Sequence, residues 1–141
     1  METIERAIEV NAPLRDVYNQ WTQFEDFPRF MEGVKEVRQL DDKRLHWRAE
    51  IAGKEKEWDA EIVEQVPDQR IAWRSMRGVV NSGMVNFTAL TPATTRVILA
   101  LHYQPANTME NIGSMLGLVA ARVTGDLRRF KDFIEQRRDG K

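Results

Sequence analysis

Three polar side chains have the types and positions that acid–base work on a small organic molecule would use. Ser75 and Tyr103 carry hydroxyl groups that can donate a hydrogen bond, and Glu64 carries a carboxylate that can accept a proton. Each follows apolar residues at intervals of two, which predicts that it shares the inner face of a strand. The alternative for each is a structural role, because polar groups near strand ends often bond to the backbone or to water.

Other kinds of site are excluded by the residue types that the chain lacks. With no cysteine among 141 residues, disulfides, thiolate nucleophiles and cysteine-bound metals are excluded. His46 and His102 alternate with apolar neighbours and should face outward from separate strands, so no metal site is predicted. No glycine-rich phosphate loop or dinucleotide-binding motif occurs. We therefore expect any chemistry to proceed without a cofactor.

The charge balance and the apolar stretches indicate the surroundings of the protein. Lysine and arginine number 21 against 22 acidic residues, a net charge of −1, so no nucleic acid is expected as a partner. Residues 1–6 lack the features of a signal peptide, and the apolar stretch 112–121 is too short to span a bilayer. We predict a cytoplasmic protein without stable membrane insertion. An alternative for residues 112–121 is contact with a membrane surface during lipid unloading.

Charged residues are also unevenly distributed along the chain. Basic residues are in excess after Arg122, and acidic residues are in excess between Glu50 and Glu64. The simplest interpretation is that both regions are solvated faces. The alternative is that the two regions dock on each other in a homodimer.

The elements that must position the candidate residues follow from the spacing of the apolar side chains. Residues 3–10 alternate as a half-buried strand, and two short helices follow before Gly33, with Asn11 as a capping residue and Pro28 as an interruption. From Val34 to Tyr103 the pattern has period two and is divided by tight turns into six strands, which predicts an antiparallel meander.

One long helix, from Met109 to Gln136, is predicted after the strands. Its apolar residues recur at steps of three and four and form a single stripe. The sheet needs a cover for its inner face, and this stripe is the element long enough to provide it. We therefore predict a single α+β domain over residues 1–141, with a curved antiparallel sheet wrapped around a C-terminal helix.

Aromatic residues are abundant on the predicted inner faces, and glycines interrupt the predicted helix. The aromatic residues are Trp47, Trp58, Trp73, Phe87 and Tyr103. They would line a hollow, or alternatively they fill the core. The helix glycines at 113, 117 and 125 would leave room for a ligand or let the N-terminal half of the helix move as a gate. The alternative for the glycines is close packing of helix on sheet.

Several motifs occur in order along the chain. They are residues 8–13 with Val17 and Trp21, residues 24–34, residues 70–75 with Asn81, Gly83 and Phe87, and residues 125–134. With these motifs the sequence resembles the SRPBCC superfamily, also called START-like or helix-grip, and within it the polyketide cyclase/dehydrase branch and the related coenzyme Q-binding domains. The resemblance implies a deep apolar cavity between the sheet and the long helix, which would take one small hydrophobic or aromatic molecule.

The resemblance also implies a reaction and a set of contact residues. In aromatase/cyclases of the superfamily a polar pair polarises a poly-β-ketone, so that enolate attack and loss of water follow. Here Ser75 and Tyr103 would stabilise the enolate oxygen and Glu64 would be the base. Arg48 and Arg74 are the cations that could stabilise an enolate, but by alternation they lie on the outer face of the sheet. This position argues against a cyclase reaction. The implied ligand contacts are Tyr18, Trp47, Trp58, Trp73, Phe87, Tyr103, Met115, Leu116 and Val119.

Two functions other than catalysis stay open from the sequence. One is a non-catalytic carrier or sensor of a lipid or quinone, which presents its ligand to another protein. The other is an interaction module whose core is filled and which takes no internal ligand.

Overall fold

The computed structural model describes residues 2–51, 53–77, 81–103 and 112–139. Within these ranges the side chains of residues 2, 51, 77, 81, 103, 112–119 and 137–139 are not described. The elements follow one another as β1 (Glu2–Val10), α1 (Leu14–Trp21), the 3₁₀ helix η1 (Phe24–Arg29), β2 (Val34–Gln39), β3 (Arg44–Ile51), β4 (Lys54–Val66), β5 (Arg70–Arg77), β6 (Asn81–Thr91), β7 (Thr94–Tyr103) and α2 (Ile112–Asp139).

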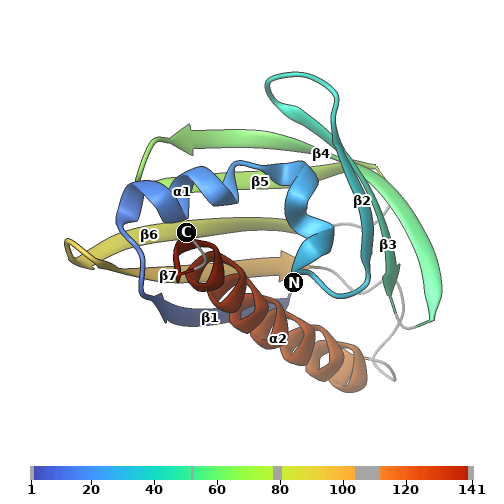
Figure 1. The fold of residues 1–141 in the computed structure, drawn as a ribbon. Coiled ribbons are helices and arrows are strands. Elements are labelled where there is room, and N and C mark those ends of the chain that lie inside the picture. Colours follow the sequence, from blue (N-terminus) through green and yellow to red (C-terminus); the bar gives the residue numbers. More distant parts are fainter. Residues whose placement is uncertain (1, 52, 78–80, 104–111, 140–141) are drawn as a thin grey trace.

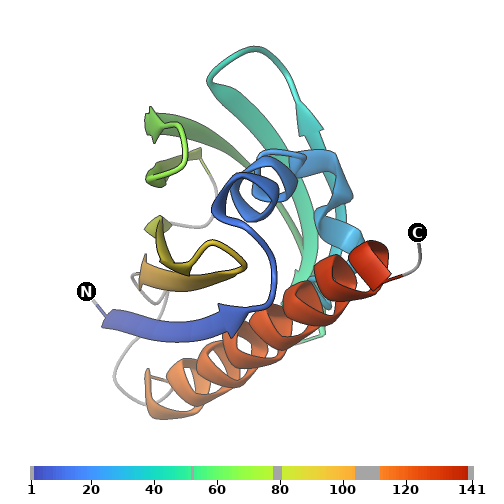
Figure 2. The ribbon, with the colours of Figure 1, turned by 60° about the vertical axis from the view of Figure 1, so that its left-hand side comes forward.

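The strands form one antiparallel sheet in the order β1-β7-β6-β5-β4-β3-β2. Strands β2 to β7 are a meander, and β1 joins it at the far edge by pairing with β7. Figures 1 and 2 show the sheet curled into a half barrel, with α2 along its concave side. This arrangement confirms the predicted fold, a curved antiparallel sheet that wraps around a C-terminal helix.

The core lies between the concave face, the C-terminal half of α2 and the two short helices. Helix α2 buries its stripe at every third or fourth position, as predicted, and the short helices add large aromatic rings. The buried residues of the stripe and of the short helices are Val123, Leu127, Phe130, Ile134, Val17, Tyr18, Trp21, Phe24 and Phe27. Burial of one such large apolar side chain contributes about 1.5–3 kcal/mol, so this cluster fixes α2 against the sheet.

Some element boundaries differ from the expectations. Pro13, not Asn11, occupies the N-cap position of α1, and the Asn11 backbone N–H instead donates to Glu135 Oε2 at 2.8 Å. Pro28 lies inside the short 3₁₀ helix η1. Helix α2 ends at Asp139, beyond the predicted Gln136, and the predicted start at 109 lies outside the described residues.

Candidate functional site

Two tryptophans face each other on the concave side of the sheet. Trp47 of β3 pairs directly with Trp58 of β4, and their rings stack with centroids 5.8 Å apart and an interplanar angle of 7°. The Trp47 ring also lies 5.5 Å from the ring of Phe27 in η1. Cross-strand neighbours project to the same side, so both indoles lie on the inner face, as the alternation predicted.

A third tryptophan lies on the same face and depends on a glycine. Trp73 of β5 pairs with Gly83 of β6. A Cβ atom at Gly83 would lie only 2.4 Å from Trp73 Cζ2, so the indole lies across the space that the glycine leaves open. The sequence carried a signal for this contact, because a glycine inside a strand often marks the close approach of another group.

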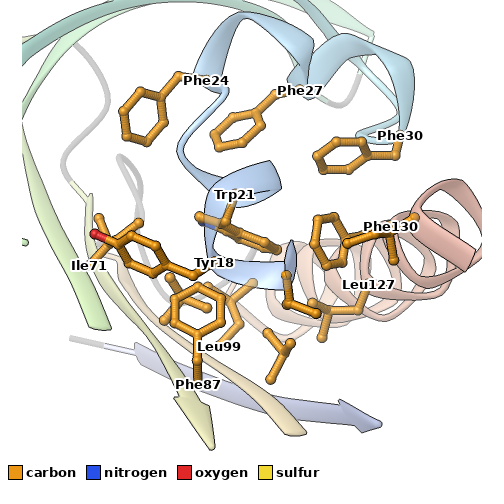
Figure 3. Packing of buried hydrophobic residues seen from close by; sticks show 14 of the residues in the cluster. Tyr18, Trp21, Phe24, Phe27, Phe30, Ile71, Phe87, Leu99, Leu127 and Phe130 are labelled. Carbon is orange, nitrogen blue, oxygen red and sulfur yellow. The ribbon is translucent and has the colours of Figure 1, made fainter. Parts of the chain in front are cut away.

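Tyr18 and Phe87 bring α1 against β6. The Tyr18 ring meets the Phe87 ring edge-on at a centroid distance of 5.5 Å, and both side chains are buried. The Trp21 ring is 6.2 Å from the Phe87 ring and 4.9 Å from the Phe130 ring of α2. Figure 3 shows the Tyr18 oxygen on the side of Ile71, turned away from Trp21 and Phe130.

Ser75 lies on the inner face, as predicted. It pairs with Ala60 of β4, which is completely buried, and it follows Trp73 by two positions on the same strand. The Ser75 side chain is itself partly buried. Its hydroxyl is thus near the tryptophan row, and its predicted catalytic role stays a prediction.

Glu64 lies on the opposite face from the one predicted. The β4–β5 register shifts between Ile62 and Glu64, so that Ile62 pairs with Trp73 but Glu64 pairs with Ala72. One extra residue in a strand reverses the alternation, and Glu64 therefore projects outward. There its carboxylate forms an ion pair with Arg70 at 3.0 Å. The expectation that Glu64 serves as a base on the inner face is wrong for this reason.

Four predicted contact residues fall where side chains are not described. Tyr103 ends β7, where its backbone pairs with Glu2 and Asn81, and residues 115, 116 and 119 belong to the first turns of α2. Contacts of Tyr103, Met115, Leu116 and Val119 with a ligand therefore stay predictions. The internal cavity also stays a prediction, because these turns of α2 would form one of its walls.

Arg48, Arg74 and both histidines lie on the outer face, as predicted, and their side chains have partners there that the sequence did not indicate. Arg74 Nη2 lies 2.9 Å from Glu61 Oε1, and Arg48 Nη1 lies 3.3 Å from Glu55 Oε1. His102 Nδ1 lies 3.0 Å from the hydroxyl oxygen of Thr3. By the alternation of side chains along each strand, these groups lie on the opposite face of the sheet from Trp47, Trp58 and Trp73.

His46 is held between two carboxylates on the same outer face. Its Nδ1 lies 2.6 Å from Asp59 Oδ1 and its Nε2 lies 2.9 Å from Glu57 Oε1. Hydrogen bonds to Asp59 and then to Glu57 raise the pKa of His46 above its usual 6.5. The two carboxylates are on different sides of the ring, and no group of three metal-binding side chains occurs among the described residues.

A polar network fastens α2 to the η1–β2 connection. Asp126 Oδ1 accepts a hydrogen bond from the Glu32 backbone N–H at 3.0 Å and another from Arg129 Nη2. Arg129 Nε donates to the Phe30 carbonyl at 2.9 Å. Burial raises the pKa of the Asp126 carboxyl, and the hydrogen bond from Arg129 opposes that change.

Arg122 extends the same network toward β3. Its Nη1 donates to the Glu32 carbonyl at 2.9 Å and to the Glu50 carbonyl at 3.3 Å. Gly33, with φ +88°, lies under this guanidinium, where a Cβ atom would be only 2.0 Å from Nη1. No pattern in the sequence indicates these contacts, because they join segments that are 72 to 94 positions apart in the chain.

Two polar atoms inside the aromatic cluster have no hydrogen-bond partner among the residues described. They are the Tyr18 hydroxyl oxygen and Trp47 Nε1. Helical spacing placed Tyr18 on the apolar side of its helix, and alternation placed Trp47 on the inner face of its strand. Neither pattern could show which partners their polar atoms would find. A buried donor without a partner costs about 1–3 kcal/mol, so such groups are uncommon in folded proteins.

Two other features of the described part of the chain do not belong to this site. A polar surface hollow at the β2–β3 turn is lined by Asp41, Asp42, Lys43, Arg44 and Glu61, on the outer face. No helix in the described ranges is long and apolar enough to cross a membrane.

Comparisons with known proteins agree with this fold. Residues 10–132 match the family described as polyketide cyclase/dehydrase and lipid transport. An uncharacterized 17.2 kDa protein from the melC2–rnhH intergenic region of Streptomyces lincolnensis is 45% identical over 138 residues, which cover 97% of this chain and 92% of that protein.

Two solved structures are similar over nearly the whole chain. The ZhuI aromatase/cyclase of Streptomyces sp. R1128 has a TM-score of 0.84 at 18% identity, over 96% of this chain and 94% of its own. A START superfamily protein of Mycobacterium smegmatis has a TM-score of 0.80 at 14% identity, over 95% of this chain and 97% of its own. Both likenesses concern the fold.

Proposed function

Because this chain belongs to the polyketide cyclase/dehydrase and lipid transport family and has the START-like helix-grip fold, we propose that it binds one small hydrophobic or aromatic molecule between the inner face of the sheet and α2. The observation that carries this proposal is the row of tryptophans on the concave face, Trp47, Trp58 and Trp73.

The burial of this row differs from that of its neighbours on the same face. Leu45, Ala60 and Ile62 are almost completely buried. All three tryptophans keep part of their surface accessible, although they lie inside the curl of the sheet. Apolar surface gains about 25 cal/mol for each Å² removed from water, so an apolar molecule placed against these rings would gain affinity from covering them.

The anchored half of α2 indicates where such a molecule would lie. The C-terminal half supplies the buried stripe, and the rings of η1 close that end of the concave face. We therefore place the ligand beside the N-terminal half, where Met115, Leu116 and Val119 are its predicted contacts. The network around Asp126 and Arg122 would keep that wall at a fixed distance from the sheet.

A cyclase/dehydrase-like reaction is the second candidate, and the position of Ser75 favours it. Its hydroxyl lies on the inner face beside Trp73, where it could donate a hydrogen bond to a developing enolate oxygen. The ZhuI aromatase/cyclase shares the fold. Against this candidate, Glu64 lies outside and cannot be the base. Simple binding, as in a carrier or sensor of a lipid or quinone, is therefore the function that the geometry supports better.

The binding proposal is tested by titration with N-phenyl-1-naphthylamine, an apolar aromatic dye that fluoresces in apolar surroundings. We expect saturable binding of one dye per chain, weakened about tenfold by Trp73→Ala because ring contact area is lost. Arg74→Ala is the matched control, since Arg74 is the next residue but lies on the outer face. Absence of saturable binding, or equal affinity in both variants, would contradict the proposed site.

The same variants separate binding from catalysis. If Ser75→Ala abolishes turnover of a poly-β-ketone analogue and retains dye binding, the chain is an enzyme. If no turnover is seen in the unmodified protein while the dye binds, the carrier function stands.

A further inference from the structure

Two hydrogen-bond donors buried in the aromatic cluster have no hydrogen-bond partner in the described part of the chain. The Tyr18 side chain is only 5% exposed, and its hydroxyl oxygen has no partner among the described residues. Trp47 Nε1 is likewise buried and has no hydrogen-bond partner among the residues that the structure describes. An indole N–H can only donate a hydrogen bond, and a phenol O–H can donate one. Both groups therefore require an acceptor.

The two donors border the same aromatic cluster from opposite ends of one run of ring contacts. Tyr18 meets Phe87 at 5.5 Å, and Phe87 meets Trp21 at 6.2 Å. Trp21 meets Phe27 at 5.8 Å, and Phe27 meets Trp47 at 5.5 Å. Tyr18 and Trp47 thus each pack against an aromatic ring, and the neighbouring phenylalanine rings carry no oxygen or nitrogen acceptor.

The position of the Tyr18 hydroxyl agrees with a role toward a ligand. In Figure 3 the ring contacts Phe87, and the oxygen lies on the side of Ile71, which belongs to the inner face of β5. Trp73 lies two positions further along β5 on the same face. In this view the hydroxyl lies on the Ile71 side of the Tyr18 ring, and the strand of Ile71 also carries Trp73, one of the three half-buried tryptophans.

The acceptor that fits these donors is a neutral oxygen. Both donors are uncharged and lie among apolar side chains, where a buried carboxylate would cost far more than a carbonyl group. We propose, on the basis of the proposed binding function, that Tyr18 Oη and Trp47 Nε1 select a flat apolar compound with carbonyl oxygen over the same compound without it. The two residues are thus specificity-determining donors in addition to apolar contacts.

A pair of probes with the same carbon skeleton tests this inference. Fluorenone carries a ring carbonyl and fluorene lacks it, and equilibrium dialysis measures the affinity for each. The unmodified protein should prefer fluorenone, and Tyr18→Phe should reduce that preference about fivefold, because one net hydrogen bond of about 1 kcal/mol is lost. Tyr18→Phe removes only an unpartnered hydroxyl, so the unfolding midpoint of the free protein should stay the same or rise.

A matched indole pair tests the second donor. Fluorenone has a single oxygen, so if its carbonyl lies at the indole end of the ring run, the loss of preference is expected in Trp47→Phe in place of Tyr18→Phe. Trp58→Phe should weaken both probes equally. Trp58 stacks on Trp47, but its nitrogen is not one of the buried unpartnered atoms.

The possible outcomes separate this inference from the proposed function. Equal affinity of the unmodified protein for both probes, or an unchanged preference in both Tyr18→Phe and Trp47→Phe, would overturn the selection by these donors and leave apolar binding intact. Binding of neither probe by the unmodified protein would contradict the binding function and this inference together.

Discussion

At the scale of single residues, the proposed site depends on a glycine in β6. Gly83 has no Cβ atom, and the Trp73 indole occupies the space above it, 2.4 Å from where that atom would be. Because this distance is far below a normal carbon–carbon contact, any larger residue at position 83 must displace the indole or the strand. Gly83 thus positions the tryptophan row without contacting a ligand itself.

The change Gly83→Ala is expected to destabilise the protein and to move Trp73. Overpacking of this kind costs about 1–3 kcal/mol, which urea unfolding would measure. The intrinsic tryptophan fluorescence should change as the indole shifts. Ser82→Ala, one position away on the opposite face of β6, is the control and should be nearly neutral. Equal stability of the two variants would show that Trp73 does not lie across Gly83 in solution.

At the scale of elements, α2 is held by packing and by a polar clamp at its middle. Asp126 accepts hydrogen bonds from the Glu32 backbone and from Arg129, while Arg129 and Arg122 donate to the carbonyls of Phe30 and Glu32. The clamp joins α2 to the segment between η1 and β2. This segment follows η1, whose rings belong to the core, so the clamp ties α2 to the part of the core that η1 supplies.

Removing the acceptor of the clamp should weaken the whole fold. In Asp126→Ala the Glu32 N–H and the Arg129 guanidinium lose their shared acceptor, and we expect a loss of about 1–3 kcal/mol in urea unfolding. Asp132→Ala, at an exposed position on the same helix, should change stability by less than about 0.5 kcal/mol. If the two variants lose the same stability, the clamp contributes nothing.

The elements were predictable from the sequence to the extent that their pattern is periodic. The alternation from Val34 to Tyr103 and the apolar stripe of the last helix are strong signals, and both elements formed as expected. The alternation of inner-face and outer-face side chains is interrupted where a strand contains an extra residue. Glu64 was therefore expected on the inner face, whereas the bulge before it turns the side chain outward to Arg70.

Contacts between distant segments could not be predicted for a different reason. Helical spacing placed Tyr18 on the apolar side of the first helix and alternation placed Trp47 on the inner face of the sheet, but hydrogen-bond partners depend on the packing of whole elements. The unpartnered donors and the clamp at Asp126 became visible only with all elements in place. Periodicity thus predicts faces, and the three-dimensional arrangement determines which groups meet on them.

At the scale of the whole molecule, the described covering elements bury part of the concave face of the sheet. The C-terminal half of α2 and the short helices bury the aliphatic part of the concave face, and the three tryptophans keep accessible surface. A bound apolar molecule would complete this core. It would also stabilise the folded state, because a ligand that binds only the native form shifts the unfolding equilibrium.

Native mass spectrometry of the purified chain tests this account most directly. The account predicts the 16.4 kDa chain with one small molecule attached, as purified or after incubation with N-phenyl-1-naphthylamine. The adduct should be weakened in Trp73→Ala and unchanged in Arg74→Ala, and solvent extraction would then identify a ligand carried from the host. A chain found only at its own mass under both conditions would contradict an internal binding site and indicate a filled core.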